Sequence, residues 1–470
     1  MILTLVANEW RALLRDGRAV TILTLGAILA VVASWAAAST DHRERLGHGD
    51  ATEAARGAWL EREADNPHSR AHYGDFVFRP SGPLAGLDSG LQMVTGRSVR
   101  LEAHRQNDSV HVPSREASSL LRFDRLEPST VLNLLVPLLL VLAGFGSVAS
   151  ERESGRLRLL RTQGVRPMTL LLGKSLSLWS IGLALVLLVI GSHLLFMHEQ
   201  PAAGPTALFL ALHAAQLWIV ATLIACVSSL TRRSGGAAAL LMGLWVASAI
   251  LLPRLAAVAA DTLFPLPSRD GFDAAMREDR EMGLDGHNPQ DARRLEIEQG
   301  VLDEYGVDSR EELPINISGV LMQADEDYGN QVWDKHFGEL RDLLLRQSAL
   351  VGAISVLNPL QATDRISMAI AGTDLGSHLD FLQQAERHRR DLVKALNDED
   401  AFGGAKTGER GWKASPEFYA SFEPFAFEPR SLRDAMAQQT TEFAGLALWF
   451  VGLLGLLLLS ARRLERGGSL

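Results

Sequence analysis

The sequence predicts an all-α membrane protein with six transmembrane helices and a large, mainly helical extracytoplasmic domain that contains minor β structure. Long uncharged apolar runs alternate with strongly polar segments, so the mean hydropathy of +0.08 averages two different populations. A run of about 18 apolar residues can cross a hydrocarbon core ~30 Å thick. Arginines gather beside the ends of these runs, as in loops that stay in the cytoplasm. The remaining polar segments are long enough to fold outside the membrane.

Composition excludes several classes of protein. The 470-residue chain carries a formal net charge of −9, which argues against nucleic acid as a partner. The single cysteine, Cys226, lies in an apolar run, so a disulfide framework is excluded. No Gly-x-Ser-x-Gly, His-Glu-x-x-His or comparable catalytic signature occurs, and we do not expect an enzyme.

The N-terminal part predicts a surface helix followed by a first span. Residues 1–18 are amphipathic, with Trp10 suited to the membrane interface and arginines to the headgroups of the inner leaflet. Residues 19–38 form the first span. A cleaved signal peptide is the alternative, but the run exceeds the ~7–15 residues of a signal core. The polar loop 39–129 follows, with a short strand expected around Ser98–His104.

The later spans and polar blocks complete the topology. Lys174, near the start of the third span, is expected to reach the headgroups with its long side chain. The fifth span is expected to stop near Pro253. Helical periodicity recurs in the acidic extracytoplasmic block, and both termini are expected in the cytoplasm. The second to sixth spans are predicted at 130–149, 168–196, 207–230, 235–252 and 443–459. The extracytoplasmic block is predicted at 261–441, with helices near 295–305, 332–345 and 381–396. The cytoplasmic tail is predicted at 460–470.

A short charged segment, residues 150–167, connects the second and third spans. Leu157, Leu159 and Leu160 form a small apolar strip, and arginines surround it. By the positive-inside rule this segment faces the cytoplasm. On charge alone, it could be a solvated basic turn that does no more than fix the topology.

The start of this segment, Glu151-Arg152-Glu153-x-Gly155-x-Leu157, resembles the cytoplasmic loop of ABC-2 type permeases, Glu-(Arg/Lys)-Glu-x-Gly-Thr-Leu, with Arg156 in place of threonine. Phe76-Val-Phe-Arg-Pro80 and Ser367-Met-x-x-Ala-Gly-Thr-Asp374 resemble a bacterial subfamily with a large periplasmic insertion of unassigned function. The resemblance implies a multi-pass permease subunit of the bacterial cytoplasmic (inner) membrane. Most relatives are exporters, and their partners are separate ABC ATPase subunits and a second permease copy or close paralogue.

In that family the loop is a coupling helix that docks on the ATPase, which binds ATP and Mg²⁺. Gly155 is expected to permit a tight turn. This chain needs such a partner, because Gly173-Lys174-Ser175 is not a phosphate loop: Met168 stands where the first glycine is required, and no strand precedes it. We expect no cofactor in this chain. The coupling residues carried over are Glu151, Arg152, Glu153, Gly155, Arg156, Leu157, Arg158 and Leu160.

Polar residues inside the spans are candidates for a translocation path. Asn133, His213 and Gln216 lie at membrane depth, where polar groups usually face protein or water. Interhelical hydrogen bonding is the alternative, and we favour it because none of the three must be ionised. His68 and His72, four residues apart, could share a helix face, but two ligands do not make a metal site, and we expect none.

Two other functional classes compete with transport. A membrane sensor could bind a ligand in its outer domain, although the chain has no cytoplasmic output domain. A scaffold could recruit envelope proteins of the periplasm. In either case the polar block, not the cytoplasmic segment, would carry the function.

Overall fold

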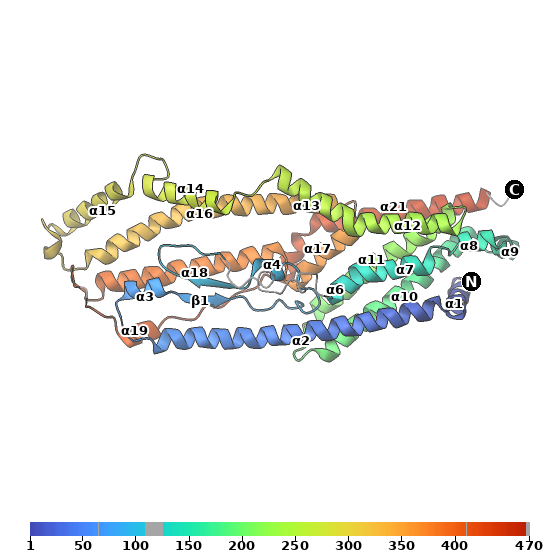
Figure 1. The fold of residues 1–470 in the computed structure, drawn as a ribbon, viewed down its shortest axis with the longest axis horizontal. Helices are drawn as coiled ribbons and strands as arrows, with labels where there is room; N and C mark the ends of the chain where they lie inside the picture. The colour runs from blue at the N-terminus through green and yellow to red at the C-terminus, as the bar shows by residue number, and fades with distance from the viewer. Residues whose placement is uncertain (64, 109–125, 410, 467–470) are drawn as a thin grey trace.

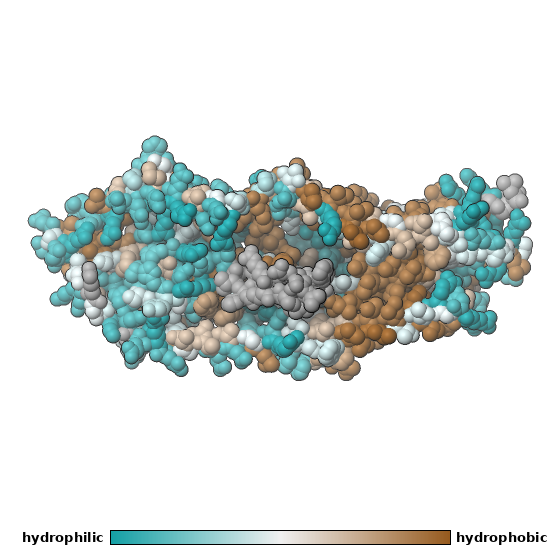
Figure 2. Space-filling view, in the orientation of Figure 1, coloured by the Kyte–Doolittle hydropathy of each residue, from teal (hydrophilic) through white to brown (hydrophobic). Residues whose placement is uncertain are grey.

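The computed structural model describes residues 1–63, 65–108, 126–409 and 411–466 (Figure 1). Parts of the expected loop 39–129 and tail 460–470 therefore lie outside the described residues. The molecule is elongated and has two halves. A bundle with an apolar surface carries both termini at its end, and a polar half, here called the distal domain, extends from the opposite end (Figures 1 and 2).

Six helical segments of the described chain are long and apolar enough to cross a membrane, and each contains one of the predicted spans. The bundle is organised around α10 (Pro167–Phe196) and α11 (Ala203–Leu230), which pack closely together. Ile181 of α10 and Leu217 of α11 are completely buried. The six segments are Arg18–Glu61, Pro128–Glu153, Pro167–Phe196, Ala203–Leu230, Ser234–Leu263 and Thr440–Arg466.

The amphipathic helix α1 (Ile2–Arg15) packs against α10, and the indole nitrogen of Trp10 donates to Ser180 Oγ over 2.9 Å. The next helix, α2 (Arg18–Glu61), runs for 44 residues from the bundle into the distal domain (Figure 1). The expectation that a loop begins at residue 39 was wrong. Polarity ends the apolar run there, but residues 39–61 lack proline and contain many alanines, glutamates and arginines, which favour a helix.

Two spans contain a proline preceded by a wider, π-helical turn. In the second span, α6 (Pro128–Thr130), η1 (Val131–Leu135) and α7 (Val136–Gly144) form one helix around Pro137. The fifth consists of α12 (Ser234–Val246), η2 (Ala247–Leu251) and α13 (Leu252–Leu263). Proline has no N–H to donate to the preceding turn, and its ring clashes with a carbonyl group of that turn. A wider π-helical turn relieves the clash and lets the helix continue. The prediction that the fifth helix stops near Pro253 was therefore wrong.

A small hairpin and several helices build the distal domain. After α3 (Pro67–Tyr73), strand β1 (Asp75–Phe78) pairs antiparallel with β2 (Ser98–Leu101), and Val77 lies opposite Val99. The short strand expected near Ser98 is thus confirmed. A short helix, α4 (Gln92–Thr95), precedes β2. Both valines pack on Phe381 of α18 (Leu375–Phe402), which itself packs against α16 (Ile317–Ser355).

The remaining helices complete the distal domain and join it to the bundle. The segments with predicted helical periodicity all lie within helices, namely α15, α16 and α18. At the junction, α17 packs on α11 and on the last span, α21, and Arg365 pairs with Glu442 over 2.6 Å. The bounds are α14 (Arg269–Met282), α15 (Gln290–Tyr305), η3 (Arg310–Glu312), α17 (Pro359–Ala371), α19 (Pro416–Ala420), α20 (Leu432–Ala437) and α21 (Thr440–Arg466).

Candidate coupling site at the terminal end of the bundle

The segment between the second and third spans folds at the end of the bundle that carries both termini (Figure 1). It consists of α8 (Ala149–Glu153) and α9 (Arg156–Thr162), here together called the elbow. Gly155 separates the two helices with a φ of +75°, at the position where the tight turn is expected. Glycine reaches this left-handed conformation without steric cost, which lets the chain turn between the two helices.

Arg152 and Glu153 hold the turn between α11 and α12. The guanidinium of Arg152 donates to the carbonyl oxygens of Ser229 and Thr231, which α11 leaves without partners at its end. The carboxylate of Glu153 accepts from the backbone nitrogen and hydroxyl of Ser234, over 3.0 and 2.8 Å, and so caps the start of α12. These two residues fasten the elbow to two spans.

Glu151 is tied to α10 and α1 through Lys174. The Nζ atom of Lys174 contacts one carboxylate oxygen of Glu151 and one of Glu9, and its side chain is only 3% exposed. The expectation that Lys174 extends to lipid headgroups was therefore wrong. The amphipathic helix packs on α10 and supplies a carboxylate in place of the headgroups.

The apolar side of α9 anchors the elbow to the bundle. Leu157 is buried in a cluster with Leu171, Cys226 and Leu464, and Leu160 packs against that cluster. Arg161 donates over 2.7 Å to the carbonyl oxygen of Leu464, near the end of α21. The elbow is therefore attached to the last span as well as to α10, α11 and α12, and through Lys174 it is linked to α1.

The opposite side of the elbow faces solvent. Gly155, Arg156 and Arg158 are exposed, and the side chain of Leu159 is 59% exposed. Leu159 was missing from the coupling residues taken from the motif. Helical geometry could have identified it, since Leu157 and Leu160 share a face at a spacing of three residues and Leu159 falls on another face. An exposed leucine on the same helix as two exposed arginines, Arg156 and Arg158, is a surface suited to contact another protein.

The three translocation candidates are buried inside the bundle. Asn133 lies in the π-helical turn η1, and its Nδ2 donates to Asp364 Oδ1 of α17 over 3.2 Å. His213 is enclosed on α11, where its Nδ1 lies 2.9 Å from the carbonyl oxygen of Phe209. The amide of Gln216 and Nε2 of His213 are buried without a hydrogen-bond partner among the described residues. Asn133 thus joins the bundle to α17, whereas His213 and Gln216 retain bonding capacity.

The Gly173-Lys174-Ser175 sequence lies within α10 and cannot cradle a phosphate. The carbonyl oxygen of Gly173 accepts from Ser177 Oγ over 2.8 Å, and Lys174 is already paired with two carboxylates. A phosphate loop needs free backbone N–H groups at the start of a helix. The geometry here agrees with the sequence in giving no phosphate loop at this position.

Family comparisons account for both halves of the molecule. A model described as an ABC-2 family transporter protein matches residues 3–302, more than half of the chain. A second model, a domain of unknown function (DUF3526), matches residues 271–421, which include most of the distal helices. No curated protein matches the chain. The chain therefore belongs to the ABC-2 transporter family and is a membrane permease that carries an additional, largely helical domain.

Proposed function

We propose that this permease is the membrane-spanning subunit of an ATP-driven exporter and that the elbow docks on a separate ATPase subunit. The observation that carries this proposal is the two-sided character of the elbow. Arg156, Arg158 and Leu159 face outward, whereas the other side is fastened to four helices of the bundle, α10, α11, α12 and α21. ATP and Mg²⁺ would be bound by that partner, and export follows the direction of most ABC-2 relatives.

The attachments of the elbow suggest how force would pass. Closure of two ATPase subunits on nucleotide would displace the exposed side of α9. Arg152 and Glu153 would carry that displacement to the turn between α11 and α12, and Glu151 would carry it through Lys174 to α10. A second permease copy or a close paralogue would supply the other wall of a translocation path. The bundle would then open alternately to the two sides.

The orientation within a bacterial inner membrane is part of the proposal. Arg462, Arg463 and Arg466 belong to the last turns of α21, which Arg161 of the elbow contacts at Leu464 and Glu465. Short arginine-rich segments remain in the cytoplasm, so we place the elbow and both termini there and the distal domain outside.

The docking surface can be tested by substituting Leu159 with aspartate and purifying the assembly from its native membrane. We expect the ATPase retained by the native chain to bind at least about tenfold more weakly, since an apolar anchor contributes more than ~1.4 kcal/mol. The control is Leu295→Asp, which changes an exposed leucine of α15 in the distal domain. Equal retention of the ATPase by the two variants would contradict docking at α9, and a copurifying kinase instead of an ATPase would favour a sensor.

A further inference from the structure

We propose that His68, His72 and His104 form a binding site for a divalent transition metal of the zinc class in the distal domain. One ligand atom from each side chain lies within 4.8 Å of the other two. The site is far from the elbow, and it requires neither an ATPase nor a translocation path. His68 and His72 alone are only two ligands, and His104 supplies the third.

The first two ligands are aligned by a capped helix. Asn66 caps α3, because its Oδ1 accepts from the backbone nitrogens of His68 and Ser69 over 2.9 and 3.3 Å. Pro67 occupies the first helical position, where its fixed backbone angle suits a helix start. A spacing of four residues then places His68 and His72 on one face, with their Nε2 atoms 2.9 Å apart.

The third ligand is presented by a strained turn after β2. Glu102 bridges to Arg105, and His104 between them has a φ of +60°, the one positive φ at a non-glycine residue in the described ranges. The backbone nitrogen of Ala103 donates to the carbonyl oxygen of Ala71 over 3.0 Å, which fixes the turn against α3. Such a conformation is unfavourable for a residue other than glycine and is typically retained where a side chain must be positioned.

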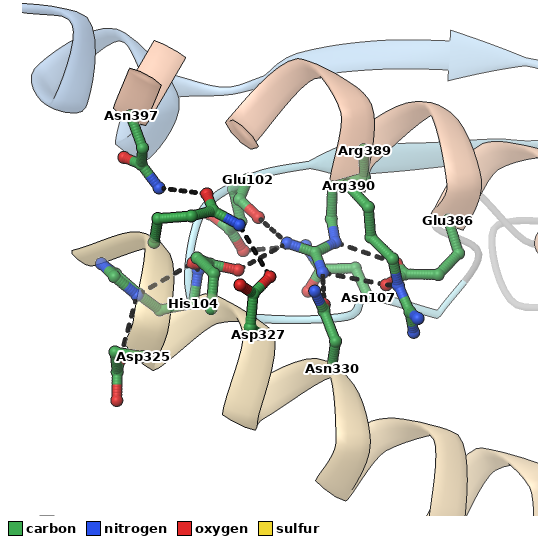
Figure 3. A network of polar contacts seen from close by, with 12 residues as sticks. Glu102, His104, Asn107, Asp325, Asp327, Asn330, Glu386, Arg389, Arg390 and Asn397 are labelled. Carbon is green, nitrogen blue, oxygen red and sulfur yellow. Dashed lines mark hydrogen bonds and ion pairs between the residues drawn. The ribbon is translucent and has the colours of Figure 1, made fainter. Parts of the chain in front are cut away.

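A carboxylate orients the imidazole of His104. Its Nδ1 lies 2.9 Å from Glu326 and 3.5 Å from Asp325, both on α16. Glu326 is in turn held by Arg389 of α18 over 3.0 Å, and both side chains are almost completely buried. Figure 3 shows Arg389 and His104 within one network of polar contacts. A histidine that gives one ring nitrogen to a carboxylate keeps the other, Nε2, for a metal. Because Arg389 holds Glu326 in place, the orientation of the His104 ring is fixed as well.

The protonation of the rings also bears on metal binding. Burial and the neighbouring imidazoles of His72 and His104 lower the pKa of His68 to about 4, and burial lowers the pKa of His72 as well. Both rings are therefore neutral at neutral pH, the form that binds metals. Asp325 and Glu326 raise the pKa of His104 to about 9, so a metal must displace one proton there.

Three imidazoles suit zinc, which in proteins takes nitrogen ligands at about 2.0–2.1 Å and four-coordinate geometry. Water could occupy the fourth position, since His72 is exposed at the surface. His104 and Asp325 also line a cavity of about 560 Å³ in the distal domain. An exchangeable metal is therefore expected, rather than one enclosed permanently in the core.

The test is a zinc titration of the full-length protein, purified without a histidine tag and treated with a chelator beforehand. Competition with a chromogenic chelator should show one Zn²⁺ per chain, and His72→Gln should weaken its affinity at least tenfold. The matched control is His287→Gln, which changes an exposed histidine of the same domain and should leave the affinity unchanged. Co²⁺ bound to the native protein should show a four-coordinate absorption spectrum that His72→Gln abolishes.

His104→Gln provides a second variant, and it is informative only if its thermal unfolding matches that of the native protein. If it fails to fold, His72→Gln decides the question, because that side chain is exposed. Zinc affinity that is equal in the native, His72→Gln and His287→Gln proteins would overturn the site. Failure of the native protein to bind Zn²⁺ would overturn it as well, and neither result would affect the proposed docking of an ATPase.

Discussion

Lys174 is a cation enclosed between two carboxylates, although the apolar run around it suggested contact with lipid. Its partners lie 165 and 23 residues away in the sequence, on α1 and α8. The charge of Lys174 and the amphipathic character of α1 were both visible in the sequence. Their pairing was not, because it depends on how α1 packs against α10.

Replacing Lys174 with methionine should destabilise the elbow end of the bundle. The substitution leaves Glu9 and Glu151 close together without a cation, and breaking a buried ion pair costs about 3–5 kcal/mol. Thermal unfolding in detergent would measure the loss. The control is Lys335→Met, which removes an exposed pair with Asp279 that should contribute at most about 1 kcal/mol. Equal destabilisation by the two substitutions would refute the importance of the enclosed pair.

Asp88 lies at the junction of the bundle and the distal domain, and it should make the free energy of unfolding depend on pH. It is buried, accepts from Gly90 and Ser367, and faces Asp364, so burial and then this carboxylate raise its pKa well above the usual range. The folded state therefore holds a proton that the unfolded state releases above its ordinary pKa of about 3.9. Stability should fall as the pH rises from that value through the raised pKa.

Asp88→Asn keeps this position neutral and should raise the unfolding temperature at neutral and alkaline pH. The decline of stability with rising pH should also become shallower. Unfolding scans across the pH range would measure both effects, with Asp308→Asn as the control because Asp308 is an exposed carboxylate of the distal domain. Parallel pH profiles of the native protein and Asp88→Asn would show that another group is responsible.

At the scale of elements, the apolar runs were sufficient to locate the six spans, because a helix needs about 20 apolar residues to cross the hydrocarbon core. They could not locate the helix ends. Composition permits α2 to continue to Glu61, and a π-helical turn lets the fifth helix pass Pro253. Such outcomes depend on packing against neighbours, which a local pattern of residues does not contain.

The two candidate sites show the same difference between what the local sequence predicts and what depends on packing. The motif located the elbow, because Gly155 and the surrounding charges are contiguous in the sequence. It could not reveal which side of the elbow is free, since Ser234 and Leu464 are distant in sequence. The grouping of the three histidines could not be predicted for a similar reason: His104 reaches α3 only through the hairpin of β1 and β2.

Gly445 of α21 lies against Val356, the residue that follows α16, and we expect this position to tolerate no side chain. A Cβ atom added to Gly445 would lie 2.9 Å from Cα of Val356, and backbone cannot rotate away as a side chain can. Gly445→Val should lower stability by about 1–3 kcal/mol, the typical cost of overpacking. Thermal unfolding should show no comparable loss for Gly455→Val in the same helix, where nothing lies within 4 Å. Equal losses would indicate a general intolerance of α21 to valine.

At the scale of the whole molecule, the proposed orientation can be measured with introduced cysteines. Cys226 is buried, and Cys226→Ser would give a background free of thiols. On that background, Glu296→Cys should react with a membrane-impermeant maleimide in cells whose outer membrane is permeable, because it is exposed on the distal domain. Arg158→Cys on the elbow should react only after the inner membrane is opened. The reverse pattern would place the termini outside.

The continuity of α2 has a mechanical consequence. At 1.5 Å per residue the helix is about 66 Å long, and roughly half of it projects beyond the hydrocarbon. Its tip is pinned to the distal domain, where the indole of Trp59 donates to the carbonyl oxygen of Tyr419 over 2.9 Å. If the rod pivots by about 5° near the bilayer centre, the tip sweeps about 4 Å. A small rearrangement within the lipid is thereby amplified into a larger displacement of the distal domain.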